Sequence, residues 1–212
     1  MTSENERLLK NIKEEKTVNQ ISLDMNISNK KIFQRIKNLS VNGYSFSRQY
    51  YYNGDIKYIL NKSFNDDDLT NRIFMDNEKN IFQALVVSDL HLGSCLERLD
   101  CLNLMYDYCI KNDIHIIVNA GDLINGMFGC PNNICIYEEQ ARYLLKNYPF
   151  DKNILNFVTL GNHDADSLFS SGLDLAKILY YNRHDIVPLG YASGKIDVKG
   201  ESILIKHRIK SQ

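Results

Sequence analysis

The sequence predicts two modules: a small α+β unit over residues 1–62 and an α/β unit over residues 81–212, joined by a polar linker over 63–80. Two observations predict this division. The first sixty residues have three helical apolar patterns followed by a hairpin signal, whereas strand-like and helical patterns alternate from residue 81 onward. The charge also divides: residues 1–62 hold 11 Lys or Arg against 6 Asp or Glu, and residues 63–212 hold 14 against 20. A basic front and an acidic back indicate different partners.

The composition, with 44% hydrophobic and 24% charged residues, is that of an ordinary globular protein. No apolar run approaches the roughly 20 residues that span a bilayer, and the charged segment at residues 1–16 is not a signal peptide. The cysteines lack the paired spacing of a zinc site, so we expect reduced thiols and a cytoplasmic protein without a membrane partner. They are Cys95, Cys101, Cys109, Cys130 and Cys135. The oligomeric state stays open.

Three helices and a hairpin are expected in the front module. Thr17 and Ser28 are suited to cap the second and third helices, and Gly43 suits a helix end. Asn53-Gly54, between β-prone runs at 44–52 and 56–60, predicts a hairpin turn. Apolar residues at helical spacing mark the three helices: Leu8, Leu9 and Ile12; Val18, Ile21 and Met25; Ile32, Ile36 and Leu39.

Residues 17–44 resemble the winged helix-turn-helix family in the spacing of these apolar and capping residues. In that family the third helix enters the major groove, so the resemblance implies a DNA partner for the front module, with RNA as another nucleic acid it could take. A solvated helix face or a protein-binding module is the alternative. Side chains able to contact phosphates and bases lie on the third helix and the following strand: Lys30, Lys31, Gln34, Lys37, Asn38 and Arg48.

The linker contains the acidic run Asp66-Asp67-Asp68 and has no clear period. We expect a solvated connector with one short helical turn near residues 69–75. In the back module the patterns predict strands at 81–87, 114–118, 154–160 and 202–206, and helices at 97–111, 137–147 and 173–180. In such α/β arrangements, loops at the carboxyl ends of strands build the functional sites.

Three loops that follow predicted strands carry Asp, His and Asn side chains. They are Ser88-Asp89-Leu90-His91, Gly121-Asp122-Leu123-Ile124-Asn125 and Gly161-Asn162-His163-Asp164. Each motif alone is weak, because Asp-x-His is common and a lone Gly-Asp is usually a turn. Together they suit a pair of divalent ions, which can neutralise phosphoryl oxygens and activate a water molecule for phosphoester cleavage.

The residue types suggest how the loops divide the work. Asp122 is suited to bridge two ions, and Asn162 offers a neutral oxygen to one of them. Asp89 and His91 alternate along a segment that we expect to be extended, so both can point at one ion. His163 is then left to contact the phosphate or to protonate the leaving group.

These three motifs resemble the first three signature motifs of the calcineurin-like metallophosphoesterases, over about residues 81–210. The resemblance implies a four-layer αββα sandwich with two mixed sheets and a dinuclear site. Mn²⁺ is the first expectation for both ions, with Fe or Zn²⁺ as alternatives. Carried onto this sequence, it implies that Asp89 and His91 bind the first ion, Asp122 bridges, Asn162 binds the second, and His163 stabilises the transition state or acts as general acid.

The later part of the family pattern is less regular here. His207 ends the strand at 202–206, where the family has a ligand for the second ion, but Arg208 stands in place of the usual glycine. Asn125 occupies a position where some branches have an Asp paired with the catalytic histidine. An amide can hydrogen-bond His163 but cannot stabilise its charged form.

The family's final Gly-His-x-His motif does not occur before Gln212, and we interpret His115 and His184 as structural. Three explanations compete: a fragment truncated at the C-terminus, which we favour and which predicts an exposed strand edge near 203–205; a degenerate domain; or ligands supplied by water or a second subunit. The leading hypothesis is a metal-dependent phosphoesterase, acting on a monoester or diester and associated with nucleic acid. The alternatives are a DNA-binding regulator whose phosphoesterase-like domain is catalytically incomplete, and a protein adaptor.

Overall fold

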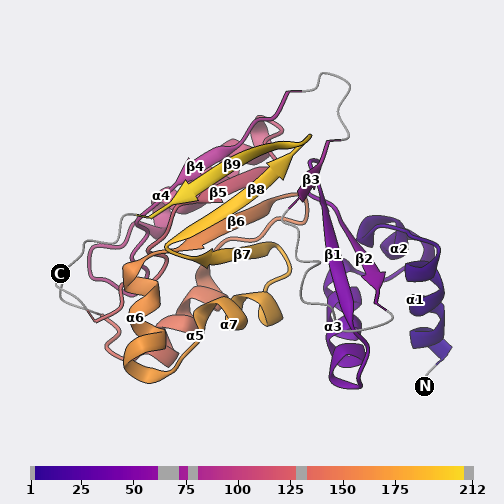
Figure 1. Cartoon of the computed structure of the whole chain (residues 1–212), viewed down its shortest axis with the longest axis horizontal. Coiled ribbons are helices and arrows are strands. Elements are labelled where there is room, and N and C mark those ends of the chain that lie inside the picture. Colours follow the sequence, from indigo (N-terminus) through magenta and orange to yellow (C-terminus); the bar gives the residue numbers. More distant parts are fainter. Residues whose placement is uncertain (1–2, 62–71, 76–80, 128–132, 208–212) are drawn as a thin grey trace. The chain divides into compact units, whose positions relative to one another are not determined.

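The structure is a computed structural model that describes residues 3–61, 72–75, 81–127 and 133–207. The contacts divide the chain into two compact units (Figure 1). The first comprises Met1–Phe82 with Asp197–Glu201, and the second comprises Gln83–Ile196 with Ser202–Gln212. Within the described residues, none of the helices combines the length and apolar character needed to cross a bilayer.

The first unit contains the expected three helices and hairpin. The helices are α1 (Ser3–Lys13), α2 (Val18–Met25) and α3 (Asn29–Val41), and the strands are β1 (Phe46–Tyr51) and β2 (Ile56–Leu60), which pair antiparallel. Thr17 caps α2 in a reciprocal pair with Gln20, and Ser28 caps α3 by accepting from the Lys31 N–H. These side chains satisfy backbone donors that a helix start otherwise leaves unpaired. The predicted apolar residues are buried, except that Met25 of α2 is partly exposed.

The hairpin turn forms where Asn53-Gly54 predicts it. Gly54 has a φ of +82°, and the Tyr51 N–H donates to the Asp55 carbonyl at 2.9 Å. A second pairing was not anticipated: Thr17, just before α2, makes an antiparallel bridge with Lys57 of β2. The hairpin is thereby joined to the entrance of α2.

The linker prediction is wrong over residues 72–74. These residues form strand β3 (Arg72–Phe74), which pairs in parallel with β1 through Tyr50 and Ile73. Ile73 is 1% exposed. Ile73 pairs with a strand more than twenty residues earlier in the sequence. Because its burial depends on this distant strand, no local pattern predicts it. The acidic run and residues 69–71 lie outside the described residues.

The second unit is built on a parallel sheet in the order β4-β5-β6-β7. Its strands are β4 (Leu85–Val87), β5 (Ile116–Asn119), β6 (Leu155–Leu160) and β7 (Ile186–Tyr191). The first three were predicted, although β4 is shorter than expected. β7 was missed because it contains Pro188 and Gly190, which are typical strand breakers; it is tolerated at the edge of the sheet. The three motif loops therefore follow adjacent parallel strands.

The helices α4 (Leu99–Lys111), α5 (Tyr137–Asn147) and α7 (Leu175–Asn182) agree with the predicted segments to within a few residues. The helix α6 (Asn162–Ser171) and the strand β8 (Ser193–Val198) were not predicted, whereas β9 (Glu201–Lys206) was. Among the described residues β9 is the last strand of its sheet, and Ile203 and Leu204 on it are 37% and 59% exposed. The parallel and mixed sheets agree with a metallophosphoesterase fold, but the expectation of two mixed sheets is wrong for the β4–β7 sheet, which is entirely parallel.

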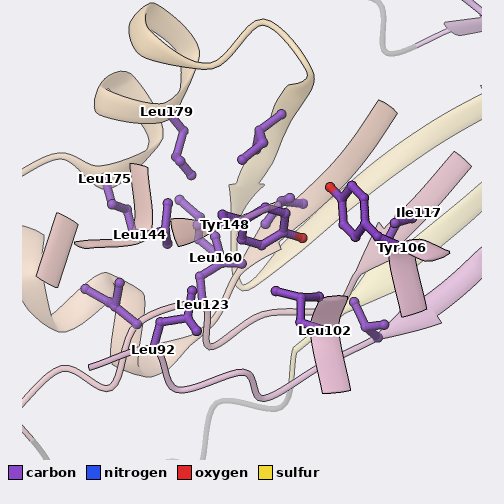
Figure 2. Close-up of a cluster of buried hydrophobic side chains, with 14 of the residues drawn as sticks. Leu92, Leu102, Tyr106, Ile117, Leu123, Leu144, Tyr148, Leu160, Leu175 and Leu179 are labelled. Atoms are coloured by element: carbon purple, nitrogen blue, oxygen red, sulfur yellow. The ribbon is translucent and has the colours of Figure 1, made fainter. Parts of the chain in front are cut away.

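One buried cluster holds the second unit together (Figure 2). Leu102 and Tyr106 of α4, Leu144 of α5 and Leu179 of α7 are buried in it together with residues of the sheet such as Leu160. Burying a leucine stabilises a fold by about 1.5–3 kcal/mol. Leu92 and Leu123, from the first two motif loops, belong to the same cluster. The core therefore anchors the loops as well as the strands.

Candidate metal centre

The first two motif loops continue side by side after their strands end. The Asp89 N–H donates to the Gly121 carbonyl at 2.9 Å, and the His91 N–H donates to the Asp122 carbonyl at 3.0 Å. Leu92 and Ile124 extend the parallel pairing by one further bridge. This backbone ladder brings Asp89 and His91 next to Asp122.

The backbone of these loops is left-handed at three predicted ligands, and the expectation of an extended Asp89–His91 segment is wrong. Asp89, His91 and Asp122 have φ values of +56°, +44° and +56°. A left-handed L-residue costs roughly 1–2 kcal/mol, and strain of this kind clusters at functional sites. The two side chains still converge, since His91 Nε2 lies 3.7 Å from an Asp89 carboxylate oxygen.

The third motif forms the start of α6, and Asp164 ties it to the second loop. The buried Asp164 carboxylate accepts three backbone N–H groups, from Leu123 at 3.1 Å, Ile124 at 3.0 Å and Gly161 at 2.9 Å. Burial raises the pKa of Asp164 to about 6, against the effect of these donors. Sequence reasoning gave Asp164 no role. An acid in the first turn of a helix, reaching back to its cap, was the available signal.

Asp122 is the centre of the cluster and its side chain is only 4% exposed. One carboxylate oxygen accepts the His163 backbone N–H at 3.0 Å. The other faces three imidazole nitrogens: Nε2 of His207 at 3.2 Å, of His91 at 3.9 Å and of His163 at 4.0 Å. One oxygen is thus held by the protein, while the other points at a group of metal-binding atoms.

Two histidines have their tautomers set by backbone carbonyls. His207 Nδ1 lies 2.8 Å from the Ala120 carbonyl, and His163 Nδ1 lies 2.5 Å from the Asn125 carbonyl. A carbonyl can only accept, so each Nδ1 carries the proton and each neutral ring presents a lone pair at Nε2. Metal-binding histidines in proteins have this arrangement. Asn125 therefore contacts His163 through its backbone carbonyl, a contact that the sequence did not suggest.

His207 and Asn162 meet as the resemblance implied, with His207 Nε2 3.1 Å from Asn162 Oδ1. Two glycines make room for this approach. A Cβ at Gly121 would lie 2.5 Å from His207 Nδ1, and a Cβ at Gly161 would lie 2.2 Å from Asp122 Oδ1. Any larger residue at either position would displace a candidate ligand.

The donor set fits two divalent ions. Ligand atoms of Asp89, Asp122 and His207 lie within 4.8 Å of one another, and so do those of His91, Asp122 and His163. Two donors about 2.1 Å from one ion are about 3.0–3.4 Å apart. His207 Nε2 and Asp122 Oδ2 are already at this separation, 3.2 Å, whereas the distances from Asp122 to His91 and His163, 3.9 Å and 4.0 Å, must shorten for a shared ion. Carboxylate and imidazole donors together suit Mn²⁺, Fe or Zn²⁺ alike.

The grouping differs in two respects from that implied by the resemblance: Asp89 groups with His207, and His163 joins His91. His91 also carries a buried Nδ1 that has no hydrogen-bond partner within the described parts of the chain. Burial and the neighbouring His163 lower the pKa of His91, which keeps the imidazole neutral and able to bind a metal near neutral pH.

Gln140 is a site residue that the sequence did not reveal. This side chain of α5 is fully buried and binds the backbone of Gly126 twice, donating to its carbonyl and accepting its N–H, both at 2.9 Å. It also donates to the Ile134 carbonyl at 2.8 Å. Because Gly126 follows Asn125, Gln140 holds the carbonyl that orients His163.

The candidate nucleic-acid residues belong to the first unit. Lys30, Lys31, Gln34 and Asn38 of α3 are exposed, and Lys37 is half-buried. Arg48 is different: it is 9% exposed, and its guanidinium lies 5.7 Å from the centre of the Tyr58 ring. The structure therefore gives Arg48 a packing role in the hairpin and does not present it on the surface with the α3 side chains.

The contacts of His115 are consistent with the structural role expected for it. His115 Nδ1 contacts the Asn153 carbonyl and Nε2 contacts Asp113, both at 3.0 Å, at the start of β5 and away from the three motif loops in sequence.

The fold and the site define a class: an α/β protein whose strand-end loops gather carboxylates and histidines suited to a pair of divalent ions. A family model described as calcineurin-like phosphoesterase matches residues 82–210. The chain belongs to this family, whose activity is metal-dependent phosphoester hydrolysis. No relative among the curated proteins matches the chain.

Proposed function

We propose that this chain hydrolyses a phosphomonoester or phosphodiester with two divalent ions, Mn²⁺ first among the candidates, held at the Asp122 cluster. The observation that carries the proposal is the position of Asp122. Its carboxylate is shared by both groups of donor atoms and faces three imidazole nitrogens. A shared carboxylate is what two neighbouring ions require.

Each residue then has a defined task. Asp89, His91, Asn162 and His207 complete the two donor groups around Asp122. When bound, the ions neutralise the phosphoryl oxygens and activate water. His163 as general acid would start as the imidazolium, with its Nδ1–H held by the Asn125 carbonyl, and would give its Nε2 proton to the leaving oxygen, which leaves the neutral ring. The same nitrogen is within reach of one donor group, so removing His163 tests which task it performs.

The direct test measures Mn²⁺-dependent hydrolysis of a generic phosphodiester and a generic phosphomonoester by the purified chain. Asp122→Ala is expected to lose hydrolysis and bound metal together. Asp107→Ala, an exposed acid on α4, is the matched control and should keep both. Equal hydrolysis by Asp122→Ala and the unchanged chain would overturn the assignment. Metal bound by the cluster without hydrolysis of either ester would instead favour the regulator with an incomplete catalytic domain.

His163→Ala separates two roles in the same assay. Loss of turnover with two ions still bound supports the general acid. Loss of one ion makes His163 a ligand, and the proton donor must then be sought elsewhere.

We further propose that residues 1–62 form a winged helix-turn-helix domain that binds DNA. The three helices, the hairpin and the bridge between Thr17 and Lys57 support it. α3 carries four basic residues and no acid, and Lys30 and Lys31 on it are exposed. DNA held by this domain would make a nucleic-acid phosphodiester the natural substrate class.

A further inference from the structure

A cavity of about 560 Å³ opens beside the metal cluster within the second unit. Asp89, His91 and His163 form its polar side. The other side comes from the loop after β4 and from α4, and consists mainly of apolar side chains: Leu90, Leu96, Leu102 and Met105. The volume is within the range of about 300–1,000 Å³ typical of small-molecule sites.

The apolar side of the cavity, the apolar wall, is partly exposed to solvent, unlike the hydrophobic core. Leu96 is 70% exposed and Met105 is 37% exposed, yet both line the cavity. Leu102 behind them is 1% exposed and belongs to the core, so the wall is anchored. An anchored apolar surface next to charged groups favours a ligand that is polar at one end and apolar at the other.

Arg98 and Met105, both in the cavity lining, favour a flat aromatic ring over an alkyl chain. At the rim, the largely exposed Arg98 guanidinium donates two hydrogen bonds to Asp100, at 2.9 Å and 2.7 Å. A guanidinium can stack on an aromatic face. The Met105 thioether also makes favourable contacts with aromatic rings.

We propose that this wall is a specificity subsite for an aromatic ring, aryl or nucleobase, attached to the phosphoester that the metal cluster cleaves. The proposal rests on the proposed function and adds the class of substrate. The phosphate lies at Asp89, His91 and His163. The ring lies against Leu96 and Met105, with the Arg98 guanidinium stacked on its face.

The test compares two phosphonates that share the phosphate-like head: phenylphosphonate and methylphosphonate. Calorimetry on the Mn²⁺-loaded chain is expected to show at least tenfold tighter binding of phenylphosphonate. Leu96→Asp and Met105→Asp should abolish this preference and leave methylphosphonate affinity within about twofold. Both residues are exposed, so these variants should fold. Leu104→Asp, on the same helix, 66% exposed and absent from the cavity lining, should keep the preference.

Steady-state kinetics provide the second readout. The kcat/KM for phenyl phosphate should fall at least tenfold in Leu96→Asp and Met105→Asp, whereas that for glycerol phosphate should not change. Equal affinity for the two phosphonates, or a preference for phenylphosphonate that survives both variants, overturns the subsite. Hydrolysis of either ester in that case still upholds the proposed function. Failure to bind either phosphonate and to cleave either ester overturns both.

Discussion

Left-handed backbone serves different purposes in the two units. In the first unit it includes Asn26, which ends α2 with a φ of +52°, and Gly54 in the hairpin turn. These two are ordinary positions for it, because an amide side chain or a glycine ends a helix or closes a turn at little cost. In the second unit it includes Asp89, His91 and Asp122, whose side chains face one another. Strain at a helix end is routine, whereas strain at three neighbouring ligands marks a site.

The helix cap of α2 in the first unit and the bonds that tie the metal centre differ in their range along the sequence. Thr17 and Gln20 cap α2 across three residues of sequence. Asp164 binds Leu123 and Ile124 across about forty residues. Local bonds of the first kind follow from local patterns, but the second kind exist only when the whole fold has formed. Variants that cut long-range bonds should therefore affect the metal centre most.

The largest effect is expected at Gly161. Alanine there would place a Cβ 2.2 Å from Asp122 Oδ1, a contact that only a shift of the loop or the ligand can relieve. Gly161→Ala should lower kcat/KM more than 100-fold and reduce bound metal. Gly172→Ala is the matched control, because its Cβ would meet nothing within 4 Å and only the positive φ of +74° is strained. It should cost about 1 kcal/mol of stability and keep the metal. Retained metal in Gly161→Ala would contradict the geometry of the site.

Asp164→Asn is expected to have the next largest effect. The carboxylate accepts three backbone N–H groups, and an amide would turn an NH₂ toward one of them. Leaving a buried donor unsatisfied costs about 1–3 kcal/mol. Denaturant unfolding should show this loss, and metal affinity should fall because the second and third loops are no longer tied. Asp107→Asn, at an exposed acid on α4, is the control. If Asp164→Asn left both the free energy of unfolding and the metal affinity unchanged, the long-range bonds of Asp164 would not be what holds the metal centre.

Gln140→Leu should affect turnover more than binding. The amide of Gln140 holds Gly126 by two bonds, and Gly126 follows the carbonyl that orients His163. Without it, kcat should fall about tenfold while the number of bound ions and KM stay near their original values. Glu139→Leu, one residue earlier and exposed, should leave all three unchanged. A loss of metal in Gln140→Leu would make its role structural.

The sequence predicted much of the fold and little of the site geometry. Thr17, Ser28 and Asn53-Gly54 act through neighbours, so their helices and hairpin were foreseen. β3 and β7 were missed because their burial depends on distant strands. At the site, the motifs indicated which residues matter, but the left-handed backbone at Asp89 and His91 follows from bonds to a second loop. Gln140 carried no sequence signal, since a glutamine on a helix is ordinarily solvated.

The smallest effect is expected in the first unit, where charge on α3 should matter through many weak interactions with phosphates. Lys30 and Lys31 are exposed, and removing one lysine that pairs with a phosphate should reduce the slope of log K against log salt by about 0.9. Lys30→Ala with Lys31→Ala should therefore weaken binding of the full chain to a short duplex by about tenfold at low salt. Lys10→Ala with Lys13→Ala, exposed on α1, removes the same charge and should change affinity less than twofold. Equal weakening by the two double variants would indicate general attraction to positive charge and not a specific role for α3. Absence of binding to any duplex at low salt would contradict the DNA proposal and would not affect the assignment of the metal centre.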